Sequence, residues 1–195
     1  MSPSEQISTG AITLPQGSVS EICFVSHDAR RFIANWAAAY GAGPFFAMTM
    51  PAEIEHDYRG APGKDSFMAA LGFMGTTLIE VIQPLDDMPS VFREVLDAKG
   101  EGAKHHVMPS IRTLSPADFD ALCAHYDTQG FTRALSLTPP GMGRNILFDA
   151  VETTGVFVEV LEVSEFVYGL LEQMYAAHLA QPGDPVMREF AELMK

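Results

Sequence analysis

Cysteine and positive charge are both scarce in this chain of 195 residues. The two cysteines, Cys23 and Cys123, form no CxxC pair and have no metal-ligand spacing, so we expect buried free thiols in a reducing cytoplasm. Lysine and arginine number 12 against 25 acidic residues, which gives a net charge of −13. This balance argues against nucleic acid or an anionic membrane as a partner, because both bind basic surfaces.

Long apolar runs are missing too. The longest uncharged stretch, residues 32–52, is broken by one asparagine, two glycines and two prolines, so it is not a membrane span. Residues 1–17 have neither a basic start nor an apolar segment and do not form a secretory signal. A hydrophobic fraction of 47% is ordinary for a globular protein. We therefore expect a soluble, cytoplasmic protein.

Hydrophobic periodicity and turn residues predict an order of elements, β-α-β-β-β, that occurs twice. The first round has a strand at 22–26, a helix at 29–41, a strand after Pro44, a polar strand at 54–60 and a strand pair at 66–84. The second has a strand at 105–111, a helix at 115–130, and strands at 133–138, 145–151 and 155–163. We expect a flexible arm at 1–18, a first module with its linker at 19–101, a second module at 102–163, and a C-terminal helix and tail at 164–195.

Two landmarks indicate that the second round is a duplicate of the first. Glu21 and His106 stand at the start of corresponding strands, 85 residues apart. Glu80 and Glu159 lie in the middle of corresponding strands, 79 residues apart. Two similar periods at independent positions are typical of an internal repeat.

The repeat also selects candidate functional residues. LIEVIQP and FVEVLEV each carry one carboxylate, Glu80 or Glu159, in an apolar strand, where an unpaired charge costs several kcal/mol. A solvated sheet face would explain one such strand, but two at matching positions favour a shared site. If the halves pack with pseudo-twofold symmetry, Glu21, Glu80, His106 and Glu159 converge in one cleft. One imidazole and three carboxylates suit a divalent cation such as Mn²⁺, Mg²⁺, Co²⁺ or Fe²⁺, with Ni²⁺ or Zn²⁺ as alternatives.

Other polar residues are weaker candidates. His105 is expected on the opposite strand face from His106 and is the alternative functional histidine. His56 and Tyr58 share one face of the polar strand and Arg59 lies on the other, so they line either a substrate pocket or a solvated edge. Arg144 follows a PPGMG turn and either reaches an anionic group of a substrate or lies on the surface.

Several motifs together resemble the vicinal oxygen chelate superfamily, which includes glyoxalase I, methylmalonyl-CoA epimerase, extradiol dioxygenases and bleomycin-resistance proteins. The duplicated βαβββ unit, the HHV strand start after GEGAK and the paired IEV and VEV strands carry this resemblance. A bacterial glyoxalase-like subgroup is more similar still, and it shares GAGPFF after the first helix, YRG, IEVIQPLDD with PSVFRE after it, and GEG followed by HH. The resemblance covers residues 19–163. It implies an α+β fold in which two βαβββ modules form a curved mixed sheet around a cleft, with an extra C-terminal helix, and it implies a homodimer.

The resemblance also implies four metal positions, at Glu21, Glu80, His106 and Glu159. The expected function is a metal-dependent isomerase, epimerase or lyase that acts next to a carbonyl of a small organic substrate through an enolate-type intermediate, with Glu21 or Glu159 as the base. Metal-dependent members usually have histidine at the first position, where this chain has Glu21. A single histidine among the four positions argues against oxygenase chemistry. The alternatives are a metal-free protein of the same fold that binds a small molecule, and a metal-free enzyme with Glu21 or His106 as the base.

Overall fold

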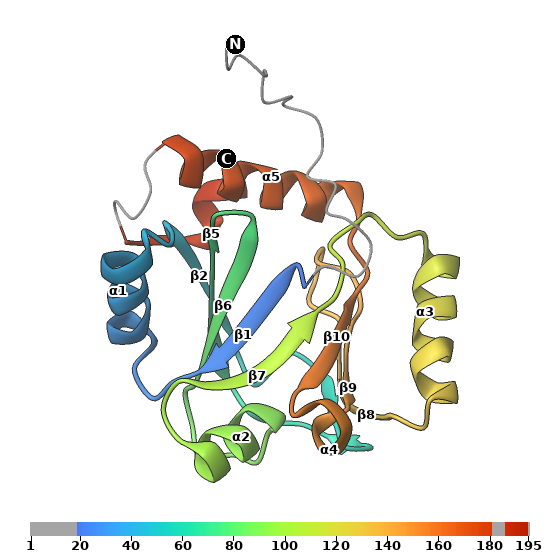
Figure 1. Ribbon diagram of the computed structural model, residues 1–195. Coiled ribbons are helices and arrows are strands. Elements are labelled where there is room, and N and C mark those ends of the chain that lie inside the picture. Colours follow the sequence, from blue (N-terminus) through green and yellow to red (C-terminus); the bar gives the residue numbers. More distant parts are fainter. Residues whose placement is uncertain (1–18, 181–185, 195) are drawn as a thin grey trace.

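The computed structural model describes residues 19–180 and 186–194, so the arm expected at 1–18 lies outside the described residues (Figure 1). The elements of the first round are β1 (Glu21–Val25), α1 (Ala29–Tyr40), β2 (Phe45–Met50), β3 (His56–Tyr58), β4 (Ala61–Pro62), β5 (Phe67–Met74), β6 (Thr77–Pro84) and α2 (Val91–Lys99). Those of the second round and the C-terminal segment are β7 (Ala103–Met108), α3 (Pro116–Thr128), β8 (Thr132–Leu137), β9 (Asn145–Asp149), α4 (Val151–Thr154), β10 (Phe157–Leu161), α5 (Glu165–Ala180), β11 (Met187–Glu189) and η1 (Phe190–Met194).

All of these strands belong to one mixed sheet, in the order β11-β2-β5-β6-β1-β7-β10-β9-β8-β3-β4. The run β2-β5-β6-β1 is repeated in reverse by β7-β10-β9-β8, and β1 and β7 pair antiparallel where the two runs meet. Within the runs, β1 is parallel to β6 and β10 is parallel to β7. The expected α+β fold of two βαβββ units in one mixed sheet is therefore confirmed.

The long helices begin at the residues that the sequence indicates. The side chain of Asp28 accepts a hydrogen bond from the backbone N–H of Arg31 and starts α1, while Gly41 ends it at φ 65°. Ser115 accepts from the backbone N–H of Asp118, and Pro116 occupies the first turn of α3. These caps are local in the chain, so the sequence was sufficient to place the start of both helices.

The helices cover the two halves of the sheet separately (Figure 1). α1 packs through Ala29 and Ile33 on a cluster that includes Ile79 and Val81 of β6. α3 packs through Phe119 and Cys123 on Ile146, Phe148 and Val160 of β9 and β10. Both outer faces are thereby buried, and the inner faces of the two halves are left to form the cavity described below.

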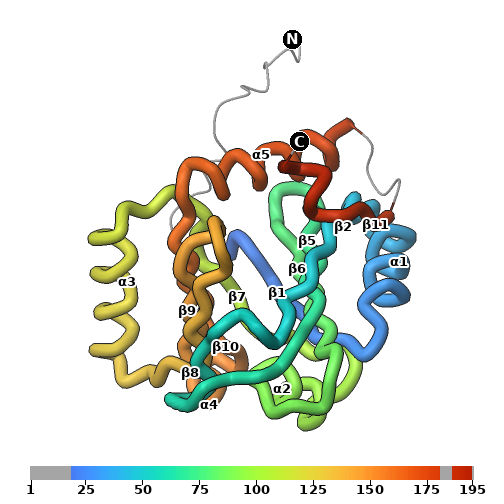
Figure 2. Tube along the Cα trace, turned by 180° about the vertical axis from the view of Figure 1, so that it is seen from behind, coloured from blue at the N-terminus to red at the C-terminus, as the bar shows by residue number. Residues whose placement is uncertain are grey.

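The polar strand expected at 54–60 differs from the prediction. Only His56–Tyr58 is extended, and β3 pairs antiparallel with β8 of the other half of the sheet. The reason is that β5 and β11 already pair with β2 on its two sides, so the polar segment can pair only at another edge. Figure 2 shows residues 51–66, here called the crossover segment, running from β2 across to β8 and back to β5.

The C-terminal part is more ordered than the tail that the sequence predicts. β11 adds to β2 as a parallel edge strand, and η1 packs near α5. The buried face of α5 includes Val167, Leu171 and Met174, and Phe166 is exposed. The helix α5 lies across one end of the sheet (Figures 1 and 2).

Candidate metal centre

The four central strands each bring one side chain to the same place. Glu80 of β6, Glu21 of β1 and Glu159 of β10 surround the imidazole of His106 on β7. The Nε2 atom of His106 lies 3.1 Å from Glu80 Oε2, 3.4 Å from Glu159 Oε2 and 3.5 Å from Glu21 Oε1. The structure therefore brings together all four residues that the repeat selected, and we call them the central cluster.

The central cluster buries an excess of negative charge, which shifts the pKa values of its members. The side chains of the central cluster are between 2% and 12% exposed. Burial, followed by the charge of Glu159, raises the pKa of Glu21 well above its ordinary value. Burial alone would lower the pKa of His106, but the acidic neighbours Cys23 and Glu159 raise it well above its ordinary value. Glu21 and His106 thus hold protons that they would release in water.

A β-bulge decides where His105 points. Between the pairs Ile22–Val107 and Phe24–Lys104, the register of β7 against β1 shifts by one residue. The extra residue brings His105 to the same side as His106, with their Nδ1 atoms 2.8 Å apart. The expectation that His105 faces away was wrong, because alternation of side chains holds only in a strand without a bulge.

The hydrogen bonds of His105 orient the ring of His106. The Nε2 of His105 donates to the carbonyl oxygen of Val91 at 3.1 Å, so its Nδ1 is left to accept a proton from Nδ1 of His106. Burial and the charge of His106 lower the pKa of His105 well below its ordinary value, which keeps this ring neutral and able to accept. His106 consequently presents Nε2 to the three carboxylates.

The central cluster fits a divalent cation. His106 Nε2 and Glu159 Oε2 are buried and have no hydrogen-bond partner among residues 19–180 and 186–194, while Asn145 Nδ2 donates to the other oxygen of Glu159. Ligand atoms of Glu21, Glu80 and His106 all lie within 4.8 Å of one another. One nitrogen and several carboxylate oxygens suit Mg²⁺, Mn²⁺, Co²⁺ or Fe²⁺, and a histidine whose other nitrogen is hydrogen-bonded is the usual form of that ligand.

The central cluster lies at the wall of a cavity between the two halves of the sheet. Asn145 is the remaining polar residue of its lining, and the other lining side chains are apolar. They come from both halves of the sheet and from the loop before β9, and include Met48, Met50, Phe67, Leu71, Leu137 and Met142. Met48 and Leu71 also pack against the cluster that contains Leu170 of α5, so the C-terminal helix supports one end of the cavity.

The structure places the weaker candidates outside the lining of this cavity. His56 is buried and contacts Asp65 at 2.6 Å through Nε2, while its Nδ1 donates to the carbonyl oxygen of Ile54. The His56 ring packs directly against Gly63, where any side chain would collide with it. This packing holds the crossover segment closed. His56 therefore holds a connection in place and does not face the cavity.

Two arginines and one tyrosine are likewise engaged elsewhere. Arg59 forms ion pairs with Glu94 at 2.7 Å and Asp149 at 2.9 Å, and Tyr58 donates its hydroxyl to the same Glu94. Arg144 contacts two carboxylates at 2.7 Å each and lies over the ring of Phe119. These three side chains are held by carboxylates and do not line this cavity, so their assignment to the substrate pocket stays a prediction.

Cys23 and Asn145 were not selected from the sequence as ligands or supports, and His105 was named only as the alternative to His106. Cys23 follows Glu21 on the same face of β1 and forms, with His105 and His106, a second group of possible ligand atoms within 4.8 Å of one another. His105 was assigned to the other face, and Asn145 only begins a strand. The pair His105-His106 was a usable signal, but only the bulge in the folded sheet shows that both rings lie together.

Comparison with known proteins identifies the fold. No protein-family model matches the chain, and no curated protein matches it. Methylmalonyl-CoA epimerase from Mycobacterium tuberculosis is 19% identical over 81% of this chain and 95% of its own, with a TM-score of 0.52. A variant of the Streptomyces coelicolor methylmalonyl-CoA epimerase in complex with 2-nitronate-propionyl-CoA is 20% identical over 77% of this chain and 97% of its own, with a TM-score of 0.55. A methylmalonyl-CoA epimerase bound to methylmalonyl-CoA and NH4+ matches with the same identity and coverage and a TM-score of 0.51.

This protein therefore has the fold of the vicinal oxygen chelate superfamily, as the motifs indicated. The match spans nearly the whole length of each epimerase chain, so both βαβββ units are included. Among the described residues, no helix is both long enough and apolar enough to cross a membrane.

Proposed function

We propose that this protein is a divalent-cation-dependent isomerase, epimerase or lyase that moves a proton on a carbon next to a carbonyl group. The observation that carries the proposal is the central cluster itself, in which three buried carboxylates face one imidazole at the wall of an apolar cavity. Such a cluster is costly to bury without a cation, and a cation in that position is useful for chemistry on a carbonyl.

Glu21, Glu80, His106 and Glu159 would hold the cation. When bound, it supplies a Lewis acid that stabilises the negative charge developing on a carbonyl oxygen. The contribution of His105 is to keep Nδ1 of His106 protonated and its Nε2 directed at the carboxylates. The apolar walls exclude water, which strengthens every charge interaction in the cavity.

Glu21 and Glu159 are the two candidate bases. In the metal-free protein the pKa of Glu21 is raised by burial and by the charge of Glu159, and its side chain lines the cavity. Glu159 lines the cavity, with one oxygen held by Asn145 and the other without a hydrogen-bond partner in the described part of the chain. Either would take a proton from carbon while the electron pair of that bond shifts towards the carbonyl oxygen.

The test combines metal binding with proton exchange. Metal-stripped protein is titrated with Mn²⁺ by calorimetry, and exchange of the methylene protons of 2-hydroxyacetophenone with D₂O is followed by NMR. Glu80→Gln should weaken Mn²⁺ binding by at least about 100-fold, because it removes a charged ligand. The control Glu152→Gln, the same change on the exposed helix α4, should have no effect.

Glu21→Gln and Glu159→Gln separate the base from the ligands. The variant that keeps most of its Mn²⁺ affinity but loses proton exchange identifies the base, whereas a lost ligand abolishes both. Wild-type protein that binds no Mn²⁺, Co²⁺, Fe²⁺, Mg²⁺, Ni²⁺ or Zn²⁺ would refute the proposal.

A metal-free binding protein is the second candidate, and the apolar lining of the cavity favours it. It predicts that an apolar ligand raises the melting temperature equally with and without a chelator. For either function we propose a cytoplasmic protein, since Cys23 and Cys123 are free and buried. The homodimer implied by the resemblance stays a prediction, which light scattering can test.

A further inference from the structure

We propose that the cavity is built for an uncharged, largely apolar carbonyl compound, and that a substrate group carrying a carboxylate or phosphate is excluded from it unless that group binds the cation directly. This inference rests on the proposed function and names its substrate class. It concerns the part of the substrate that lies inside the cavity, beyond the two oxygen atoms that would face the central cluster.

The cavity lining has little positive charge to hold an anionic group. Among the described residues, those that line the cavity include no lysine or arginine, and the only basic group is His106. The polar lining residues besides His106 are Asn145 and three carboxylates. A carboxylate buried there without a cation would cost several kcal/mol, and the acidic neighbours would add repulsion.

The arginines that could have served as anion receptors are already paired. Arg59 contacts Glu94 and Asp149, and each of these distances is below 3 Å. Arg144 is held by two carboxylates and by the ring of Phe119 at 4.3 Å. An incoming anion would have to displace carboxylates from either arginine, which is unfavourable in a protein with an acidic excess.

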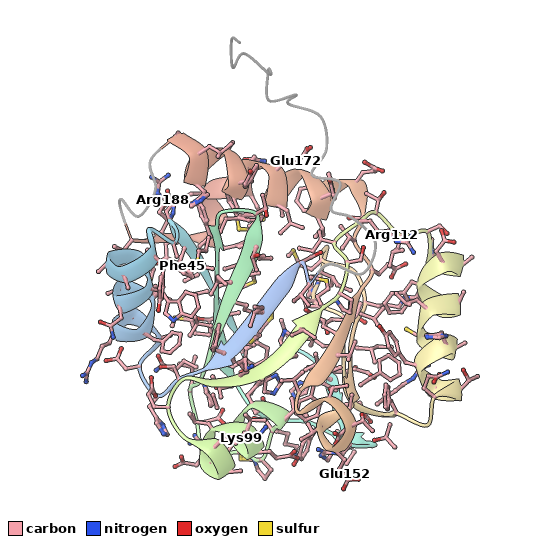
Figure 3. The ribbon with its side chains drawn as sticks, in the orientation of Figure 1. Phe45, Lys99, Arg112, Glu152, Glu172 and Arg188 are labelled. Carbon is pink, nitrogen blue, oxygen red and sulfur yellow. The ribbon has the colours of Figure 1, made fainter. Side chains whose placement is uncertain are left out.

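The apolar part of the lining indicates which kind of group the cavity accepts. Methionine, leucine and phenylalanine side chains from both halves of the sheet line the cavity. Met48, Met50 and Met142 are flexible and polarisable, so they can adapt to an aromatic or alicyclic group. Figure 3 shows the labelled charged residues Lys99, Arg112, Glu152 and Glu172 at the periphery of the molecule, away from the strands of the central cluster.

The test uses three matched probes that share vicinal carbonyl and hydroxyl oxygens. They are 2-hydroxyacetophenone, its 4-methyl derivative and its 4-carboxy derivative, and their affinities are measured by calorimetry with Mn²⁺-loaded protein and with protein in a chelator. The two neutral probes should bind at least about tenfold more tightly than the carboxylate, which corresponds to one poorly solvated charge. Methylmalonyl-CoA is the fourth ligand and should bind more weakly than the neutral probes.

A variant with a positively charged side chain in the cavity lining tests the opposite case, in which an anionic probe should bind. Met142 is half-buried in the loop between β8 and β9, so Met142→Lys should be accommodated without loss of the fold. It should bind the 4-carboxy probe at least about tenfold more tightly than wild type does. Met142→Gln, which is polar but uncharged, should not.

The outcomes separate this inference from the proposed function. A preference for neutral probes in both metal-loaded and chelated protein, together with no proton exchange, would refute the proposed reaction and support the substrate class. Equal or tighter binding of the 4-carboxy probe or methylmalonyl-CoA by wild type in the chelator, where no cation can hold the carboxylate, would overturn the substrate class, even if exchange depends on Mn²⁺. Failure of all neutral probes to bind at millimolar concentration would overturn it as well.

Discussion

Charged residues gather in two kinds of place in this molecule, and water makes the difference between them. On the outer surface, Arg59 and Arg144 each meet two carboxylates, and their side chains are 38% and 37% exposed. At the centre of the sheet, His106 meets three carboxylates and its side chain is 2% exposed. Both places have more acidic than basic groups. Water and salt screen the excess negative charge on the outer surface but not at the buried centre of the sheet.

The comparison shows why the central cluster is a candidate site and the arginine clusters are not. An exposed ion pair contributes little to stability and needs no further partner. A buried excess of charge must be relieved by retained protons or by a cation, and the raised pKa values of Glu21 and His106 are the first of these responses. The following changes are ordered from the largest expected effect to the smallest.

Removing the single basic group should have the largest effect. His106→Leu leaves three buried carboxylates without an imidazole, and we expect a loss of about 3–5 kcal/mol in the free energy of unfolding at neutral pH. Urea unfolding of the metal-free protein measures this loss. Adding Glu80→Gln to the same chain should restore part of it, whereas Glu152→Gln should restore none. Unchanged stability of His106→Leu would contradict the charge argument.

Removing the support of that imidazole should have the next largest effect. His105→Leu deletes the acceptor for Nδ1 of His106, so Mn²⁺ affinity measured by calorimetry should fall by about 10–100-fold. His105→Gln retains an acceptor and should recover much of the affinity. In nitrogen-15 NMR spectra of the metal-free protein, the Nδ1 proton of His106 should be hydrogen-bonded in wild type but not in His105→Leu. Identical spectra would refute the positioning role.

Changing the pH should alter the central cluster without altering the sequence. Since the folded pKa of His106 is raised above its ordinary 6.5, its contribution to stability is present below that value and is lost as the pH rises through the raised pKa. The raised pKa of Glu21 has the same sign. Between about pH 6.5 and 8.5 the melting temperature of the metal-free protein should therefore fall.

A bound divalent cation should remove this dependence, because it replaces the retained protons. Mn²⁺ should accordingly raise the melting temperature most at the high end of the range, and its affinity should fall as the pH is lowered. Thermal unfolding in a chelator and in Mn²⁺, over the same buffers, measures both effects. A metal-free melting temperature that rises across this range would show that the carboxylates are solvated after all.

Breaking an outer cluster should have the smallest effect. Arg144→Gln removes an arginine that is 37% exposed, so we expect a loss of about 0.2–1 kcal/mol in the free energy of unfolding. Mn²⁺ affinity should stay unchanged, and so should binding of 2-hydroxyacetophenone. A large loss of affinity for that probe would mean that Arg144 does reach the substrate.

Much of the fold could be predicted because its signals are local. Asp28, Ser115 and Gly41 mark helix ends through hydrogen bonds and backbone angles that involve near neighbours only. Strand partners are not local, so the polar segment around His56 could be placed in a strand but not beside β8. The short helix α4 was likewise missed, since Val151 was predicted to end one strand and Gly155 to begin the next.

Which residues form the central cluster was decided by the sequence alone, because a duplicated chain repeats its strand positions and thus carries Glu80 and Glu159 to equivalent places. The tertiary structure decided how those residues are presented. The bulge in β7 turned His105 towards His106, and the pairing of β1 with β7 brought the two halves within 3.5 Å of each other at the cluster. Contacts across the sheet also assigned Arg59 and Arg144 to the surface and left the cavity apolar. The physical reason is that alternation along a strand specifies only a face, whereas register, bulges and the choice of neighbouring strands arise from hydrogen bonds between distant parts of the chain.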